Sequence, residues 1–296
     1  MTADRSVDAA AEPVVVLDHV TREFRRRGAP WQAGSAVVAL DDVSLQIPRG
    51  SKFGVVGESG SGKTTLVRLV AALDQPTSGR VVVDGVDISR LQERQLRPLR
   101  RRLQLVFQDP MGSLDPRMRI RDVVAEPLRS NFGRKVPDSE PFPTEDWRAR
   151  VSEVLAAVGL DDSALDRYPH QFSGGQRQRI SIARAIAPRP GILLADEAVS
   201  ALDVSTRGQI LDLLAELATT EDFTLLFVSH DLSVIRHVCD RVAVLRRGIL
   251  VESGLIADVY DRPQHPYTAE LLAAVPTLAG GVERARGRAG DPEATI

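Results

Sequence analysis

The sequence has very little cysteine, no long apolar run and no excess of either charge. Cys239 is the only cysteine among 296 residues, which excludes an internal disulfide and any Cys-rich metal or iron–sulfur site and favours a reducing, cytosolic compartment. No apolar run approaches the ~20 residues that cross a bilayer, and residues 1–12 contain no apolar signal core. If the protein works at a membrane, another chain must supply the membrane span.

The charges nearly cancel, since the chain has 38 basic and 40 acidic residues. No net field therefore draws the chain to nucleic acid or to anionic lipid. Two short basic runs, at 22–27 and 97–102, are interpreted as solvated surface. A hydrophobic content of 43% is enough for one large core or two modest ones. We expect a globular protein without a nucleic-acid partner.

One stretch, residues 57–65, fits the phosphate-binding pattern GxxxxGK[ST] and is called the phosphate loop below. Its glycines let successive backbone N–H groups point at anionic oxygens, Lys63 supplies a charge for the β- and γ-phosphates, and Thr64 offers a hydroxyl to Mg²⁺. Chance produces this pattern in roughly one per cent of chains of this length, but here a strand-like run precedes it and helical spacing follows. The residues expected to bind nucleotide are Gly57, Glu58, Ser59, Gly60, Ser61, Gly62, Lys63, Thr64 and Thr65.

The pattern along the chain predicts an α/β fold. Short strands at 14–17, 37–40 and 43–47 precede the phosphate loop and suggest an antiparallel β subdomain. Strand signals then stop between about 109 and 180, which indicates an inserted helical subdomain with a surface loop at 133–144. From residue 191 strands and helices alternate, which predicts a mostly parallel core sheet. Residues 1–12 and 280–296 are expected to be disordered tails, and 26–35 a loop.

Two acids, Asp196 and Glu197, follow the apolar run at 192–195. A phosphate site needs a second group directed at Mg²⁺, and we assign that role to Asp196. Glu197 points elsewhere and is a candidate general base for an attacking water. Without the phosphate loop, solvated surface would be the better interpretation of these two acids.

A second helix start lies at Ser173, Gly174, Gly175 and Gln176, called the signature below. Ser173 occupies a capping position, and the two glycines expose backbone N–H groups to an anion. A chain with one phosphate loop does not need a second anion site. The signature therefore raises the question whether it serves the nucleotide of another chain.

Taken together, the motifs resemble the ATP-binding subunits of ABC transporters. The resemblance rests on the order of the phosphate loop, Gln108, the signature, Asp196-Glu197, the run at 200–203 and Ser229-His230. It implies a P-loop NTPase fold, an ABC cassette over 13–279, with ATP and Mg²⁺ as cofactors. It also implies that two cassettes close face to face, so that each nucleotide lies between one subunit's phosphate loop and the other's signature.

Carried onto this chain, the resemblance implies a role for each matching residue. Lys63 and Thr64 hold phosphate and Mg²⁺, while Gln108 senses Mg²⁺ and the attacking water. Ser173, Gly174 and Gly175 clasp the partner's γ-phosphate, and Asp203 lines the dimer seam. His230 contacts γ-phosphate and orients water beside Glu197. Phe24 stacks on adenine, although a core aromatic is an equally weighted interpretation; His19, His170 and His237 are given structural or surface roles.

A narrower resemblance points to the oligopeptide/dipeptide importer branch. It rests on the runs at 108–118, 125–128, 168–171 and 265–272, the last within a C-terminal extension of about 254–279. This branch implies a second ATPase subunit, the same or similar, below two transmembrane permease subunits, with an extracytoplasmic binding protein that delivers the solute. The chain would then act as a peripheral protein on the cytoplasmic face of the plasma membrane.

Three departures from the family stand out: Ala198 replaces the usual proline, Phe172 replaces the leucine of most cassettes, and the C-terminal cysteine cluster of some branch members is missing. None removes a catalytic group. The alternatives are an exporter ATPase, a soluble ABC ATPase in DNA repair or translation, and a non-hydrolysing module. The soluble classes call for coiled-coil heptads, zinc cysteines or two cassettes in one chain, and the non-hydrolysing class calls for a lost catalytic group. The solute and the choice between homodimer and heterodimer stay open.

Overall fold

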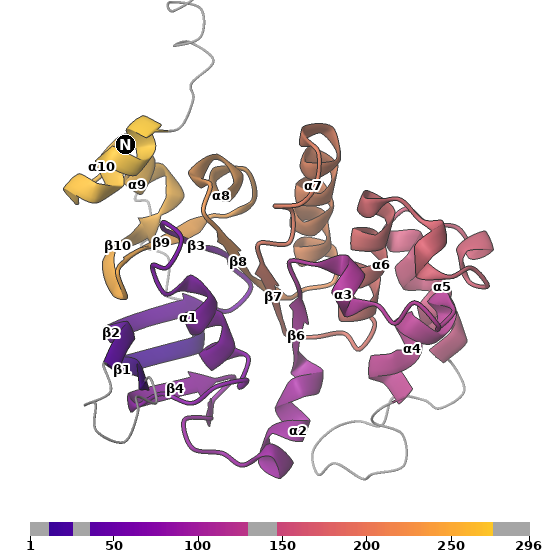
Figure 1. Cartoon of the computed structure of the whole chain (residues 1–296), viewed down its shortest axis with the longest axis horizontal. Helices are drawn as coiled ribbons and strands as arrows, with labels where there is room; N and C mark the ends of the chain where they lie inside the picture. The colour runs from indigo at the N-terminus through magenta and orange to yellow at the C-terminus, as the bar shows by residue number, and fades with distance from the viewer. Residues whose placement is uncertain (1–11, 26–35, 130–146, 275–296) are drawn as a thin grey trace, which may run out of the picture.

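The computed structural model describes residues 12–25, 36–129 and 147–274 (Figure 1). The expected tails, apart from residue 12, and the loops expected at 26–35 and 133–144 lie outside the described residues. Within the described ranges, no helix combines the length and apolar character needed to cross a bilayer.

Two sheets organise the chain. The first is antiparallel, in the order β2-β1-β4-β5, and its strands are β1 (Pro13–Arg25), β2 (Ala36–Pro48), β4 (Ser78–Val83) and β5 (Val86–Asp87). The second has the order β10-β9-β3-β8-β7-β6, with β3 (Lys52–Val56), β6 (Leu103–Val106), β7 (Ile192–Asp196), β8 (Thr224–Ser229), β9 (Arg241–Arg246) and β10 (Ile249–Leu255). All its neighbouring strands are parallel except β9 and β10. The predicted α/β class, with a mostly parallel core sheet and an N-terminal antiparallel sheet, is confirmed.

The two short strands expected at 37–40 and 43–47 form the single strand β2. A left-handed residue, Asp42 with φ 51°, interrupts the alternation of buried and exposed positions between them. Opposite, His19 of β1 has φ 50°, and its Nδ1 lies 2.7 Å from Asp42 Oδ1. An irregular register at this point lets the strand continue, because the interruption in one strand is matched by one in its partner.

The side chains of β8 show why the two halves of the molecule have separate cores. Leu225 and Phe227 face a core shared with the helical region, whereas Leu226 and Val228 face a core shared with the antiparallel sheet. Successive side chains of a strand point to opposite faces, so β8 is buried on both sides. The central sheet therefore separates two hydrophobic cores, one on each of its faces.

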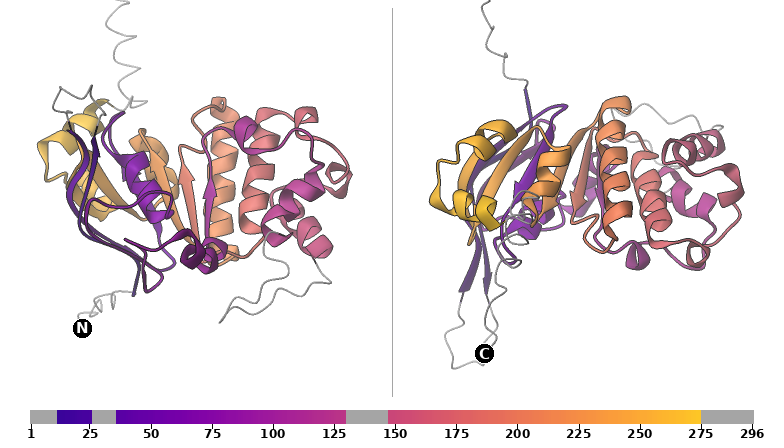
Figure 2. Two further views of the ribbon diagram at one scale, coloured as in Figure 1. Left: turned by 60° about the horizontal axis from the view of Figure 1, so that its bottom comes forward. Right: turned by 90° about the horizontal axis from the view of Figure 1, so that it is seen from above.

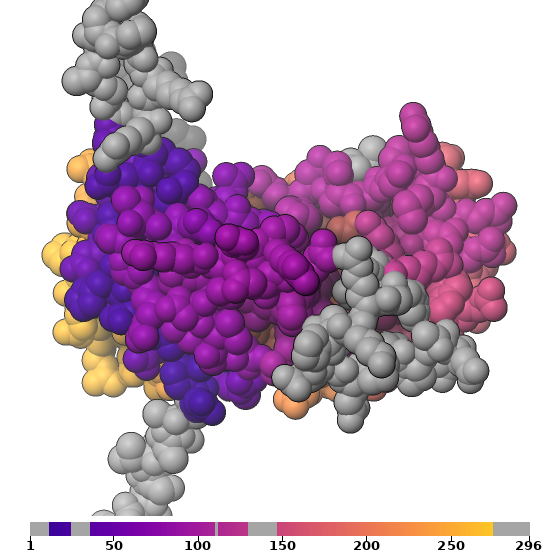
Figure 3. Space-filling view, turned by 90° about the horizontal axis from the view of Figure 1, so that it is seen from below, coloured from indigo at the N-terminus to yellow at the C-terminus, as the bar shows by residue number. Residues whose placement is uncertain are grey.

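Helices cover the central sheet (Figures 1 and 2). On the antiparallel-sheet side lie α1 (Lys63–Val70) and α2 (Glu93–Arg102). The helical region at the opposite end contains α3 (Pro110–Ser113), α4 (Ile120–Arg129), α5 (Trp147–Ala157) and α6 (Gly174–Ile186). It also contains the 3₁₀ turns Asp162–Ala164 and Pro169–Gln171. The remaining helices are α7 (Val204–Thr220), α8 (Leu232–Val238), α9 (Ile256–Asp261) and α10 (Pro266–Ala274). Seen from below, the N-terminal part of the chain and the helical region occupy opposite ends of the surface (Figure 3).

Helix α2 is absent from the sequence-based prediction, which assigned only surface character to 97–102. Arg102 is indeed exposed and Arg100 is partly exposed, and they pair with Asp84 and Glu93 respectively. Leu96 and Leu99 are buried beneath them. Two apolar positions three residues apart, with Pro98 between them, are too weak a periodic signal for a helix.

Candidate nucleotide-binding site

The phosphate loop joins β3 to α1 and is held by two close backbone approaches. A Cβ at Gly57 would lie 2.1 Å from the carbonyl oxygen of Leu245, and one at Gly62 would lie 2.5 Å from that of Ala39. Gly62 also has φ 105° and occupies the N-cap of α1. Only glycine meets these conditions without displacing backbone, so the loop's shape depends on both positions.

Lys63, the first residue of α1, is 5% exposed. Its Nζ donates hydrogen bonds to the carbonyls of Gly57 and Glu58, each at 2.8 Å. Burial lowers the pKa of Lys63, and the carboxylates of Glu197 and Asp196 oppose that shift. The first N–H groups of a helix have no intrahelical acceptor, so the start of α1 adds donors and the positive end of its dipole to the lysine's charge.

The parallel register brings the acids to the same edge. Val56 at the end of β3 pairs with Ser229 of β8, and Val228 of β8 pairs with Asp196 of β7. The residues that follow these strands therefore meet at one place, as ligand-binding residues do at the carboxyl ends of parallel strands. The phosphate loop, Asp196-Glu197 and His230 are thus neighbours.

Asp196 meets the requirements of an Mg²⁺ ligand. Burial and the adjacent Glu197 raise its pKa, while Lys63 and a hydrogen bond from the Thr64 hydroxyl oppose the rise. Its Oδ1 is buried without a hydrogen-bond partner in the described part of the chain. Mg²⁺ takes few protein ligands and completes its octahedron with waters and phosphate oxygens. One free carboxylate oxygen beside one hydroxyl, facing a phosphate loop, therefore fits this ion.

Glu197 has a left-handed backbone, with φ 47°, which is uncommon for a residue other than glycine. Its N–H donates to the carbonyl of Val228 at 3.0 Å, which fixes the turn at the end of β7. Its Oε1 lies 3.3 Å from His230 Nδ1. Glu197 and His230 are therefore in contact although 33 positions separate them.

Gln108 follows β6, whose Val106 pairs with Ala195 of β7. This register brings Gln108 to the same edge as the acids, where its side chain is exposed. Phe24 lies near the end of β1, paired with Val37 of β2, and is 38% exposed with the Arg22 guanidinium 4.5 Å from its ring centre. Ala39, two residues beyond Val37, carries the carbonyl that touches Gly62. Such exposure argues against a core aromatic at Phe24.

The signature forms the start of α6, away from the phosphate loop of the same chain (Figure 1). The Ser173 hydroxyl accepts from the Gln176 N–H at 3.3 Å, and the Gln176 side chain accepts from the Ser173 N–H at 3.0 Å. Gly174 opens the helix, and a Cβ at Gly175 would lie 2.4 Å from Thr206 Cγ2. The starts of α6 and α7 are therefore packed together.

Asp203 caps the neighbouring helix α7. Its Oδ1 accepts from the Thr206 N–H at 3.0 Å and from the Ser205 hydroxyl at 2.7 Å, and these bonds lower the pKa of Asp203. It is exposed beside the signature. Within this chain Asp203 shapes the surface that carries the signature, a role that sequence reasoning did not assign to it.

Comparison with known proteins identifies the family. Residues 40–200, more than half of the chain, match the family model described as ABC transporter. The chain belongs to the ABC transporter family. A putative peptide import ATP-binding protein of Brucella ovis is 47% identical over 90% of this chain and 79% of its own length. The oligopeptide transport ATP-binding protein AppF of Bacillus subtilis is 43% identical over 94% of this chain and 83% of its own.

Solved ABC cassettes have the same fold. The dimeric structure of the ATP-binding cassette MJ0796 bound to ADP and Pi superposes with a TM-score of 0.69 at 32% identity, covering 82% of this chain and 98% of that one. The CbiO1 protein of Clostridium perfringens superposes with a TM-score of 0.70 at 25% identity, covering 92% and 99%. The predicted cassette fold is confirmed. Phe24, Asp203, His230 and the C-terminal helices of this cassette lie outside the range matched by the family model.

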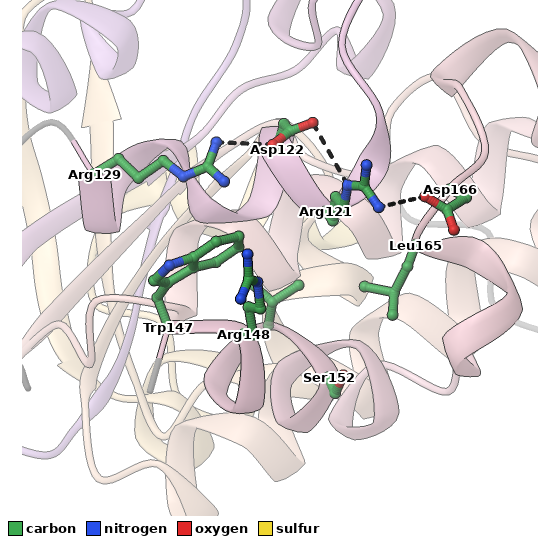
Figure 4. A pocket seen from close by; sticks show the side chains of 9 residues that line it. Arg121, Asp122, Arg129, Trp147, Arg148, Ser152, Leu165 and Asp166 are labelled. Atoms are coloured by element: carbon green, nitrogen blue, oxygen red, sulfur yellow. Dashed lines mark hydrogen bonds and ion pairs between the residues drawn. The ribbon is translucent and has the colours of Figure 1, made fainter. Parts of the chain in front are cut away.

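The cassette also has a pocket of ≈ 400 Å³ in its helical region, lined by residues of α4 and α5 and by Leu165 and Asp166 (Figure 4). Arg129 lies 4.2 Å from the ring centre of Trp147 and Arg148 lies 5.1 Å from it. Arg129 also pairs with Asp122, and Arg121 pairs with Asp166. Most of the pocket's charge is therefore neutralised by its own walls.

Proposed function

We propose that this chain is the ATP-hydrolysing, energy-coupling subunit of an ABC importer for oligopeptides, dipeptides or a related small solute. The observation that carries the proposal is the unpartnered Asp196 oxygen beside Thr64 and Lys63, at the edge where Glu197 contacts His230. The names of the relatives, which include peptide import, oligopeptide transport and dipeptide transport ATP-binding proteins, support the importer class.

In this proposal the phosphate loop and Lys63 bind the triphosphate, and Thr64 and Asp196 hold Mg²⁺. Bound Mg²⁺ would neutralise charge that builds up on the transferred phosphoryl group. Glu197 accepts the proton of the attacking water at its carboxylate, and His230, 3.3 Å away, orients that water and faces the γ-phosphate. Gln108 lies at the same edge and senses Mg²⁺ and the attacking water, while Phe24 stacks on the adenine.

A second cassette completes the site in the proposed cycle. Ser173 and Gly174 are exposed at the start of α6, and Ser173 with the following N–H groups presents donors and a positive helix end to the partner's γ-phosphate. ATP then closes a dimer of the same or similar chains. The closure is passed through the helical region to two permease subunits, so the cassette works at the cytoplasmic face of the plasma membrane, and a binding protein outside delivers the solute.

The test compares the wild type with Glu197→Gln at equal concentrations, with ATP and Mg²⁺, by phosphate release and by light scattering. We expect Mg²⁺-dependent hydrolysis in the wild type, loss of at least 100-fold in the variant, consistent with removal of a general base, and an ATP-dependent dimer of the variant. The matched control is Asp212→Asn, an exposed acid that pairs with His237 on the surface and should keep full activity. Full hydrolysis by Glu197→Gln would contradict the assigned base.

A wild type that hydrolyses nothing alone is tested again with a similar cassette and the two permeases present. Recovery of hydrolysis would assign the chain to a mixed dimer. No hydrolysis and no ATP-dependent dimer in either setting would contradict the energy-coupling role.

A further inference from the structure

The phosphate loop is contacted by a residue more than two hundred positions away. The Glu58 N–H donates a hydrogen bond to the Tyr267 hydroxyl oxygen at 3.2 Å. Tyr267 belongs to the first turn of α10, lies outside the matched family range, and is 1% exposed. Its buried hydroxyl therefore contacts the phosphate loop rather than solvent.

The surroundings of Tyr267 hold it firmly. Its N–H donates to His265 Nδ1 at 3.1 Å, and the His265 N–H donates to a carboxylate oxygen of Glu252 on β10, also at 3.1 Å. A second Glu252 oxygen accepts from the Gln264 N–H at 2.8 Å. The Arg246 guanidinium lies 4.5 Å from the Tyr267 ring centre. The start of α10 is thus anchored to β10, and the phenol has little freedom to leave the loop.

Tyr267 belongs to a set of contacts that brace the loop from one side. The Gly248 N–H, in the turn after β9, donates to the Ser61 carbonyl at 2.9 Å, and the Leu245 carbonyl packs against Gly57. The same Glu58 that donates to Tyr267 accepts a hydrogen bond from Lys63 Nζ through its carbonyl. The tyrosine therefore fixes a residue that in turn contacts the phosphate-binding lysine.

We propose that Tyr267 is a positioning residue for nucleotide binding, through which the C-terminal extension pre-shapes the phosphate loop. The proposal deepens the function proposed above and rests on it. A loop already held in its binding shape loses less conformational freedom when ATP binds, so the hydroxyl favours binding without contacting ATP. Loss of one neutral hydrogen bond of ordinary strength predicts an affinity for MgATP about three- to tenfold weaker.

The experiment uses the full chain and the variant Tyr267→Phe, which keeps the ring against Arg246 and removes only the hydroxyl. The matched control is Tyr260→Phe in α9. The Tyr260 hydroxyl likewise makes a hydrogen bond to the backbone, here as the donor to the Leu232 carbonyl, but it does not contact the phosphate loop. The Kd for a fluorescent ATP analogue with Mg²⁺, and the KM and kcat of hydrolysis, are measured for all three proteins. Thermal unfolding without nucleotide checks that each is folded.

The expected result is a Kd and a KM three- to tenfold higher for Tyr267→Phe, with kcat within twofold of the wild type and no change in Kd for Tyr260→Phe. A variant that is merely less folded would lower the amplitude of the titration and leave its midpoint unchanged, which would overturn the inference. An equal change of Kd in both variants, or no change of Kd in either, would also overturn the inference. A wild type that binds no MgATP would overturn the proposed function and this inference together. If the wild type binds MgATP but Tyr267→Phe fails to show the expected change in Kd, only this inference is overturned.

Discussion

The clearest stability prediction concerns Arg150, a charged side chain on α5 that is only 3% exposed. Its guanidinium donates to the carbonyls of Ile186 and Ala187 at the end of α6, at 2.9 and 3.2 Å, and to Glu221 at the end of α7, at 2.6 Å. One side chain thereby joins three helix ends between the helical region and the core. In Arg150→Met the hydrocarbon packing is largely kept, but the two carbonyls lose a donor. Glu221, 17% exposed, loses its charge partner, and so does the more exposed Glu153 on α5 itself.

Removing one partner of a buried, hydrogen-bonded ion pair costs about 3–5 kcal/mol. Because Glu221 retains some access to water, we expect Arg150→Met to lower the free energy of unfolding by about 3 kcal/mol, near the lower end of that range. The control is Arg189→Met, whose side chain is 61% exposed and pairs with Glu153 at the surface. Exposed pairs of this kind contribute roughly 0–1 kcal/mol, so the control should change little.

Urea unfolding followed by fluorescence and by circular dichroism measures both variants, and coincident transitions establish that one free energy describes each. The double variant Arg150→Met/Glu221→Leu should be more stable than Arg150→Met alone, because the unpaired carboxylate is removed as well. A loss below about 1 kcal/mol for Arg150→Met, indistinguishable from the surface control, would refute the reasoning that this arginine joins the helical region to the core.

Three further predictions follow from the site. Gly62→Ala should weaken MgATP binding at least tenfold in a titration, since its Cβ would lie 2.5 Å from the Ala39 carbonyl oxygen and its φ of 105° is strained for alanine; binding as in the wild type would contradict this. Asp196→Asn should abolish Mg²⁺-dependent hydrolysis yet unfold at a higher urea concentration at pH 7. The raised folded-state pKa of Asp196 means that the folded chain binds more protons than the unfolded one just above the ordinary aspartate pKa of 3.8, so stability falls as pH rises through that window. The variant should lose this part of the pH dependence. Ser173→Asp should preserve the cap of α6 and the unfolding midpoint, because aspartate is a good N-cap, but should prevent the ATP-dependent dimer of a Glu197→Gln background by charge repulsion, as gel filtration would detect; a dimer of normal affinity would argue against contact between the signature and the γ-phosphate.

The sequence carried the chemistry of the site in short, local patterns. The phosphate loop, the Asp196-Glu197 pair and the signature each span a few residues, and their spacing follows from the geometry of one loop or one helix start. The alternating and helical periods likewise predicted the α/β class and the separation of an antiparallel sheet, a parallel sheet and a helical region. Weakly periodic segments such as α2 were not recognisable in this way.

By itself, then, the sequence determined which candidate catalytic groups are present and in which order, because each motif is complete within one turn or strand end. Only the tertiary structure decided which distant groups meet. The contact of Glu197 with His230 depends on the register of β7 and β8, and that of Glu58 with Tyr267 spans 209 positions. Arg150 donates to groups at the ends of α6 and α7. Such contacts arise from strand register and packing between elements, which no local period of residues encodes.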